Sequence, residues 1–270
     1  MPKPKKDPRV EALSAIRSKG ASGKITGEKN AKLLKTAKAY ESKYKRPCII
    51  GSYSIPAGST CPGAAGCLRG CYARSGNYMY VNVAKRLYIN WLSLGKSKQS
   101  ATVTILNAVR AWYYKNHKSY ACTYLVRIHD AGDFFAQFYL DAWTQAIKTF
   151  NEESAPEHEV IFYGYTKSLH LNFSEFLSLP NVRFVQSLDG KYQPDWDHGV
   201  AAIVPKDSEI TGSWVDANGD EGIQDLAVID GHKRIALTYH GSGAGNWFNT
   251  TEEIDAGLVP GDLVQIGARK

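Results

Sequence analysis

The sequence predicts one α/β domain with an incomplete or irregular (β/α) barrel-like, mostly parallel sheet and a basic N-terminal arm. The 270 residues, 43% of them apolar, are enough for one large core. Short apolar runs alternate with longer amphipathic segments between residues 124 and 204, which indicates right-handed crossovers between parallel strands. No clear helix separates the runs 182–186 and 200–204, which favours an open sheet or an incomplete barrel.

The N-terminal part divides at residue 46. Residues 1–30 carry Gly20, Gly23 and Gly27 among Lys and Ser, and predict a flexible arm with one helical turn near Val10–Ile16. Residues 30–44 predict a basic helix that ends before Pro47. We therefore expect a basic arm and helix over 1–46 and an α/β catalytic domain over 47–270.

The catalytic domain is expected to begin with a strand at Cys48 and a cysteine loop over residues 56–78. Its further predicted helices are 83–94, 101–116, 138–150 and 171–177, and its further predicted strands are 124–129, 160–165, 182–186 and 200–204. Residues 226–229 and 234–239 predict a late strand pair or hairpin around Asp230-Gly231. No run approaches the roughly 18 apolar residues of a membrane span, so we expect a cytoplasmic protein with no membrane partner.

The net charge of +7 is unevenly distributed. Residues 1–46 hold 14 basic and 4 acidic residues, and such a segment gains affinity for phosphate backbones by releasing counterions. The sequence therefore predicts a nucleic-acid contact, with a solvated arm that aids solubility as the alternative. The expected contact residues are Lys32, Lys35, Lys38, Lys43, Lys45 and Arg46.

Three of the five cysteines, Cys61, Cys67 and Cys71, fall within eleven residues rich in glycine. Clustered thiols in a glycine-containing loop are typical of a metal site in a reducing compartment. The spacing C-x5-C-x3-C suits zinc completed by another ligand or an iron–sulfur cluster with one open iron, and it does not separate the two. Cys48 and Cys122 lie in apolar runs and are expected in the core.

Polar residues follow three successive predicted strands. His129, Asp130 and Asp133 come first, and since active sites of parallel α/β sheets lie at the carboxyl ends of strands, they are candidate catalytic residues. The alternatives are a helix-capping role for Asp133 and a buried structural role for His129. Asp189 ends a later strand and is a further catalytic candidate.

Candidate substrate-binding residues are Phe134, Tyr165, Lys167, Ser187 and His240. Tyrosines of this region, such as Tyr72 and Tyr78, suit stacking on unpaired bases or core packing.

Five motifs together resemble the phage gene product 88 domain proteins over roughly residues 45–245. They are Cys-Pro-Gly-Ala, Gly-Cys71-Tyr-Ala, Arg-Ile-His-Asp-Ala-Gly-Asp-Phe-Phe, Tyr-Gly-Tyr-Thr-Lys-Ser and Ser-Leu-Asp-Gly. This resemblance implies a phage protein acting in the host cytoplasm.

The order of motifs is more distantly similar to radical S-adenosylmethionine enzymes. In that family a cysteine loop follows the first barrel strand and a Gly-Gly-Glu-like turn ends the second. The resemblance implies an iron–sulfur cluster on the three cysteines and S-adenosylmethionine near Gly132 and Asp133. The usual spacing of that family is C-x3-C-x2-C, and both gaps are wider here.

Asp130-Ala-Gly132-Asp133-Phe134 also resembles the base-binding turn of guanine transglycosylases. That resemblance implies exchange of guanine for a 7-deazaguanine, which needs a carboxylate nucleophile such as Asp189, Asp195 or Asp230. The zinc ligands of those enzymes lie late in the chain, whereas these cysteines lie early.

We therefore expect a phage-type DNA base-modifying transferase that takes DNA, single-stranded or with an extruded base, and a small-molecule base as substrates. Transglycosylase-like exchange with a zinc or other metal site is favoured slightly over iron–sulfur radical chemistry. The third alternative is a non-catalytic, metal-stabilised DNA-binding protein.

Overall fold

The computed structural model describes residues 7–27, 30–68, 71–154, 158–188, 190–205, 209–217 and 224–238. Seven strands among them form one sheet in the order β1-β2-β3-β4-β5-β7-β6, and every pair is parallel. The α/β prediction with a mostly parallel sheet is confirmed. The strands β1 to β5 follow the chain order, as in a β/α barrel, and no pairing between β6 and β1 is present in the described part of the chain.

The strands are β1 (Cys48–Tyr53), β2 (Thr123–Ile128), β3 (Glu159–Thr166), β4 (Val182–Ser187), β5 (Val200–Val204), β6 (Val215–Asp216) and β7 (Arg234–Thr238). The helices are α1 (Pro8–Lys19), α2 (Ala31–Tyr44), α3 (Val81–Leu92), α4 (Lys98–Asn116), α5 (Gln137–Ser154), α6 (Ser174–Leu177) and α7 (Gln224–Ile229). Three short 3-10 helices lie between β1 and α3, namely η1 (Gly66–Leu68), η2 (Tyr72–Arg74) and η3 (Gly76–Met79). No helix in the described ranges is both long and apolar enough to cross a membrane.

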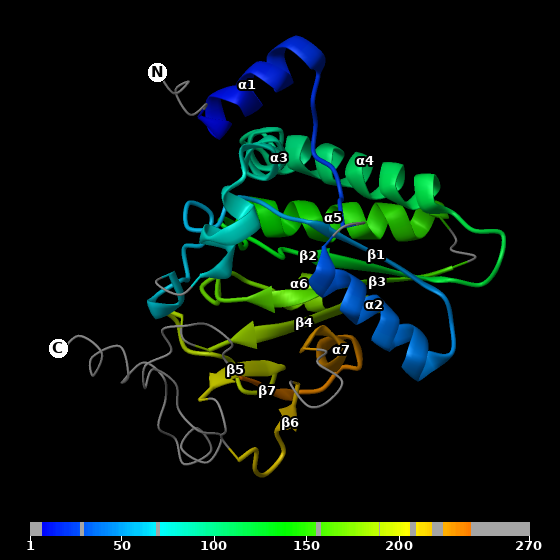
Figure 1. Cartoon of the computed structure of the whole chain (residues 1–270), viewed down its shortest axis with the longest axis vertical. Helices are drawn as coiled ribbons and strands as arrows, with labels where there is room; N and C mark the ends of the chain where they lie inside the picture. Colours follow the sequence, from blue (N-terminus) through cyan, green and yellow to red (C-terminus); the bar gives the residue numbers. More distant parts are fainter. Residues whose placement is uncertain are drawn as a thin grey trace.

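Helices cover both faces of the sheet (Figure 1). Alternate strand residues, such as Tyr124 and Phe162, pack with α4, α5 and α6 in one core cluster. The intervening residues, such as Leu125 and Ile161, pack with α2 and α7 in a second cluster. Side chains that point to opposite faces in turn explain why these strands read as continuous apolar runs.

The N-terminal segment folds onto the domain. Asp7 accepts a hydrogen bond from the Arg9 backbone N–H at the start of α1, and Gly20, with φ of 58°, ends the helix. These two caps make a twelve-residue helix where the sequence predicted one turn. Thr26 then pairs with Ser52 of β1 in an isolated antiparallel bridge, so the described part of residues 7–27 packs on the structured core.

The predicted late hairpin is wrong in its first strand, whereas its second strand, predicted over residues 234–239, is confirmed as β7. Residues 224–229 form α7, and β7 returns parallel to β5. A four-residue apolar run does not separate a strand from a buried helix. Gly231, with φ of 78°, donates its backbone N–H to the Val228 carbonyl, and this turn ends a helix instead of joining two strands.

Candidate functional site

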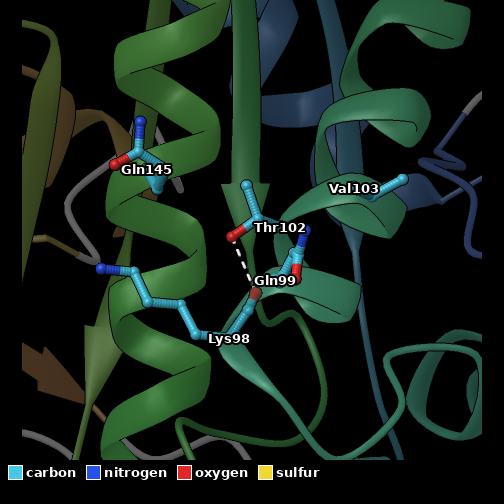
Figure 2. A pocket seen from close by; sticks show the side chains of 5 residues that line it. All are labelled: Lys98, Gln99, Thr102, Val103 and Gln145. Atoms are coloured by element: carbon cyan, nitrogen blue, oxygen red, sulfur yellow. Dashed lines mark hydrogen bonds between the residues drawn. The ribbon is translucent and has the colours of Figure 1, made fainter.

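The carboxyl ends of β1 to β4 bring together most of the predicted site residues. The strands β4 and β5 point toward the side of the molecule on which the cysteine loop lies (Figure 1, cyan). The structure therefore places the cysteine loop, the residues after β2 and the residues after β3 at one edge of the sheet, as the parallel-strand argument predicts. The hollow between α4 and α5 is lined by other residues, namely Lys98, Gln99, Thr102, Val103 and Gln145 (Figure 2).

Asp130 is the carboxylate at the centre of this edge. It is 5% exposed, and its Oδ2 atom accepts hydrogen bonds from Asn30 Nδ2 at 2.8 Å and from the Tyr78 hydroxyl. The Tyr72 hydroxyl donates to the Asp130 backbone carbonyl. Burial raises the pKa of Asp130, but nearby Arg127, the Tyr78 hydrogen bond, Lys32 and Asn30 together hold the pKa below its usual value. Asp130 is therefore an ionised carboxylate inside a cage of donors.

Asp130 belongs to a buried ion-pair network that includes side chains of β2, β3 and α7. Arg127 on β2 contacts Asp225 of α7, and its Nε atom lies 3.6 Å from Asp130 Oδ1. Tyr163 on β3 donates its hydroxyl to Asp225 Oδ2 at 3.2 Å. Burial lowers the pKa of Arg127, yet the two carboxylates hold it well above its usual value. Arg127 Nε and Asp225 Oδ1 have no hydrogen-bond partner, so the network is only partly satisfied.

Lys32 belongs to this site. It lies in the first turn of α2, and its ammonium sits 5.5 Å from the centre of the Tyr72 ring. Burial and the nearby Arg127 lower the pKa of Lys32, while Asp225 and Asp130 raise it. The structure therefore directs this side chain toward Asp130, whereas the sequence predicted a surface phosphate contact.

The other predicted contact residues lie along the rest of α2 and just after it. Lys35, Lys38 and Lys45 are exposed. Lys43 pairs with Asp230 at 2.7 Å, and Arg46 lies 3.5 Å from Glu159. These two pairs lie at the far end of α2 from Asn30 and Asp130, about 20 Å away along the helix. Asp230 is therefore remote from the site and is excluded as its nucleophile.

His129 has an unusual backbone conformation and a buried ring. Its φ is 64°, in the left-handed region that non-glycine residues rarely adopt. The ring contacts Phe134 and Tyr139, and Nε2 lies 2.8 Å from the Tyr139 hydroxyl, while Nδ1 has no partner. Burial and Arg127 lower the pKa of His129 to about 3. The imidazole is therefore neutral at pH 7, and it belongs to the aromatic core instead of the donor cage.

Asp133 ties two strand ends together. Its Oδ1 atom accepts hydrogen bonds from the Phe134 backbone N–H at 2.7 Å and from Thr166 Oγ1 at 2.8 Å, and its Oδ2 atom accepts one from the Lys167 backbone N–H at 2.8 Å. Burial raises the pKa of Asp133, and these donors partly offset the effect. All of these contacts are within the strand-end loops, so Asp133 has the geometry of a cross-link between β2 and β3.

Gly132 lets this turn approach the start of the cysteine loop. Its φ is 84°, and a Cβ atom there would lie 2.4 Å from Ile55 Cγ1 and 2.8 Å from Thr60 Oγ1. Only glycine fits this conformation and this space.

The cysteine loop, residues 56–78, lies over the carboxyl ends of the strands and is called the lid below. A Cβ atom on Gly63 would lie 1.9 Å from the Lys167 carbonyl oxygen after β3, and the Gly63 carbonyl accepts a hydrogen bond from the Lys191 backbone N–H at 2.8 Å. Ala64 forms an isolated bridge with Gly190, after β4. Further along, the loop supplies the hydroxyls of Tyr72 and Tyr78 to Asp130. One segment thus contacts the ends of three later strands.

The three cysteines of the loop are half-buried. Burial raises the pKa of Cys61 to about 12, with added repulsion from Asp133, Cys71 and Cys67, and burial also raises the pKa of Cys71. The chemistry of these thiols fits a metal, but in the described residues no group of three His, Cys, Asp or Glu side chains is placed to hold an ion. Metal binding by these cysteines stays a prediction.

The remaining cysteines and substrate candidates have defined places. Cys122 is fully buried, and Cys48 packs against the second core cluster, as expected. Phe134 is in the aromatic core, and the Tyr165 ring lies 5.6 Å from the Arg127 guanidinium. Lys167 Nζ donates to Ser187 Oγ at 2.6 Å, which joins the ends of β3 and β4. Asp189 and His240 lie outside the described residues.

Sequence reasoning missed Asn30, Arg127 and Asp225 as members of the site. Arg127 alternates with apolar residues in a strand, and a lone charge in such a run signals a buried partner. Asn30 reads as a helix cap, a role that it also has through Lys32 and Leu33. No local signal links Asp225 to Arg127, since the two are 98 residues apart.

Comparisons with known proteins identify relatives for most of the chain. The family model of gene product 88 matches residues 24–248. The Gene 88 protein of Mycobacterium phage D29 is 32% identical over 158 residues, which are 53% of this chain and 63% of that protein. The Gene 88 protein of Mycobacterium phage L5 is 32% identical over 122 residues, 44% of this chain and 48% of that protein. The chain thus aligns with less than two thirds of either relative. No solved structure matches it.

Proposed function

The chain belongs to the phage gene product 88 family, and from this premise we propose that it is a nucleic-acid base-modifying enzyme. The proposal is supported above all by Asp130, an ionised carboxylate at the carboxyl edge of a parallel sheet that accepts hydrogen bonds from a hydroxyl and an amide and interacts with the positive charges of Arg127 and Lys32. Buried charges with shifted pKa values are enriched at functional sites, and Arg127 Nε and Asp225 Oδ1 have no hydrogen-bond partner in this network.

Asp130 is proposed to bind the target base. Its Oδ2 atom accepts from Asn30 and Tyr78, and two N–H groups on the edge of a guanine-like base would satisfy the same carboxylate. The base takes the place of these donors when the cysteine loop opens. Tyr72 favours this arrangement because its hydroxyl reaches Asp130 while the residue is 50% exposed, and a base could stack on the part of the ring that Tyr78 and Lys32 do not cover.

The proposed reaction is base exchange. A carboxylate oxygen forms a bond to the sugar C1′ as the glycosidic bond breaks, and the departing base takes up a proton. The incoming base then attacks C1′, gives up its proton and releases the carboxylate. Asp189, which comes two residues after β4 in the sequence, is the proposed nucleophile, since Asp230 is remote and Asp195 is exposed and pairs with His198 at 2.9 Å.

A second candidate function is iron–sulfur radical chemistry with S-adenosylmethionine. It is favoured by one observation, the place of the cysteine loop directly after β1 and beside the Gly132 turn. Cys61, Cys67 and Cys71 would hold the cluster, which would supply the electron for cleavage of S-adenosylmethionine. Iron and sulfide content of protein purified without oxygen separates the two candidates: about four irons with matching sulfide support radical chemistry, and a colourless protein supports exchange.

The test of base exchange uses phage-type DNA and isotopically labelled guanine or 7-deazaguanine. We expect label to enter the DNA with wild-type protein. Asp130→Asn, which keeps the shape but not the charge, is expected to lower kcat/KM by about 5- to 150-fold, the value of one bidentate base contact. Asp197→Asn, an exposed carboxylate beyond β4, serves as the matched control.

Two results would contradict the proposal. One is no incorporation of any labelled base by folded wild-type protein. The other is an Asp130→Asn variant that is as active as Asp197→Asn.

A further inference from the structure

Charge is segregated along the chain far beyond the N-terminal segment. No Asp or Glu occurs between Glu41 and Asp130, a stretch of 88 residues that carries 13 Lys and Arg. Residues 130–270 hold 22 acidic and 9 basic residues. The acid-free stretch comprises the end of α2, β1, the cysteine loop, α3, α4 and β2. These elements bring no carboxylate of their own, and the acids that pair with their basic residues, such as Glu11 with Lys85 and Glu153 with Arg110, come from other segments.

Within this stretch lies a group of exposed apolar side chains beside the cysteine loop. The η3–α3 patch consists of Met79, Tyr80, Val81 and Val83, with exposed fractions of 66%, 65%, 38% and 36%. Four large apolar side chains exposed within five consecutive residues are unusual for a surface that contacts only water. Tyr80 caps the start of α3 without using its side chain in a cap hydrogen bond.

The η3–α3 patch is joined to the strand-end site. Tyr72 and Tyr78 are in ring contact, with centroids 5.8 Å apart, and both donate hydroxyls to Asp130. Tyr78 and Met79 belong to the same 3-10 helix. Tyr80 thus comes two residues after a tyrosine that reaches Asp130, and Arg74 of the neighbouring η2 is exposed.

We infer that the η3–α3 patch binds a single-stranded nucleic acid and delivers one base to the strand-end site. Aromatic and apolar side chains on a basic surface bind unpaired strands because bases stack on the rings while cations pair with phosphates. A duplex hides its base faces, so it gains the charge term alone. The partner is identified by charge complementarity: a phosphate backbone suits a surface whose own charged residues from 42 to 129 are all basic. This inference rests on the proposed function for the fate of the base, but not for the binding itself.

The experiment measures fluorescence anisotropy of a labelled oligothymidine of about 20 nucleotides, longer than the about 4 to 16 nucleotides that one such surface covers. Full-length protein is titrated at several salt concentrations against the single strand and a duplex of equal length. We expect tighter binding of the single strand. Tyr80→Ala is expected to weaken it by about 5- to 150-fold, the loss of one base stack.

Matched variants separate stacking from charge and from general damage. Tyr120 is another tyrosine of the acid-free stretch and is 53% exposed, but it precedes β2 and so lies at the amino ends of the strands. Tyr120→Ala is expected to change the affinity for the single strand by less than about twofold. Arg74→Gln is expected to reduce the slope of log affinity against log salt by about 0.7, one phosphate contact. Thermal unfolding confirms that each variant is folded.

The inference is overturned if Tyr80→Ala and Tyr120→Ala bind alike, if duplex binds as tightly as single strand, or if no oligonucleotide binds at low salt. The last result would assign the patch to a protein partner. Single-strand binding through Tyr80 without any change in nucleoside composition would leave the inference intact and refute the proposed function. Base exchange that is insensitive to Tyr80→Ala would refute the inference and leave the proposed function intact.

Discussion

The buried imidazole of His129 makes the stability of the fold depend on pH between about 3 and 6.5. Its pKa is about 3 in the folded protein because burial and Arg127 disfavour the charged ring, whereas the ordinary value is 6.5. Between these values the unfolded chain binds more protons, so stability is present above pH 6.5 and falls as the pH falls toward 3. At pH 5 the difference amounts to about 2 kcal/mol.

The assay is urea unfolding of wild type and His129→Asn at pH 7 and pH 5. Asparagine tolerates a φ of 64° and does not titrate, so the variant is expected to lose about 2 kcal/mol less than wild type between the two pH values. Tyr139→Phe, which removes the hydroxyl 2.8 Å from Nε2, should keep the wild-type pH response because burial is the larger cause. The reasoning is refuted if wild type and His129→Asn lose equal stability.

Three further predictions concern the lid and the network beneath it. Gly63→Ala places a methyl 1.9 Å from the Lys167 carbonyl oxygen, so the loop must shift. We expect the free energy of unfolding in urea to fall by about 1 to 3 kcal/mol and proteolysis of the loop to become faster. An unchanged rate of cleavage would contradict the close packing of the loop on the strand ends. Arg127→Leu leaves Asp225 buried without its cation and should cost about 3 to 5 kcal/mol, part of which a second substitution, Asp225→Leu, restores if the ion pair is the cause. Cys67→Ser is expected to abolish metal binding, measured as bound iron or zinc per chain, and full metal content in this variant would rule out a three-cysteine site.

The sheet could be predicted because its strands are apolar runs of ordinary length. Residues 123–128 and 159–166 face helices on both sides, and burial of both faces leaves a strong signal in sequence. The short run Leu226–Ile229 carries no such signal, since four apolar residues fit a helix turn as well as a strand. As α7 it packs in the second core cluster and brings Asp225 to Arg127, contacts that exist only in the folded chain.

The sequence predicts at which ends of the strands the candidate residues lie, but it does not predict which of their side chains contact one another. The position of Asp130 after a strand was enough to assign it to the carboxyl edge. The basic neighbours of Lys32 in the sequence predict a phosphate contact, whereas in the structure its ammonium lies over the Tyr72 ring and interacts with the charge of Asp130. The same helix exposes Lys35 and Lys38. Which lysine faces inward depends on where α2 packs, and that is a property of the whole fold.

The span of the cysteine loop has a consequence for the order in which the chain folds. Gly63 and Ala64 meet Lys167 and the residues 190–191, more than a hundred positions further along the chain. On a ribosome, the loop leaves the exit tunnel long before β4 exists, so the lid has nothing to rest on until most of the sheet has been made. The contacts of the loop with residues 167 and 190–191 therefore form late, after the strands β1 to β4 have been made.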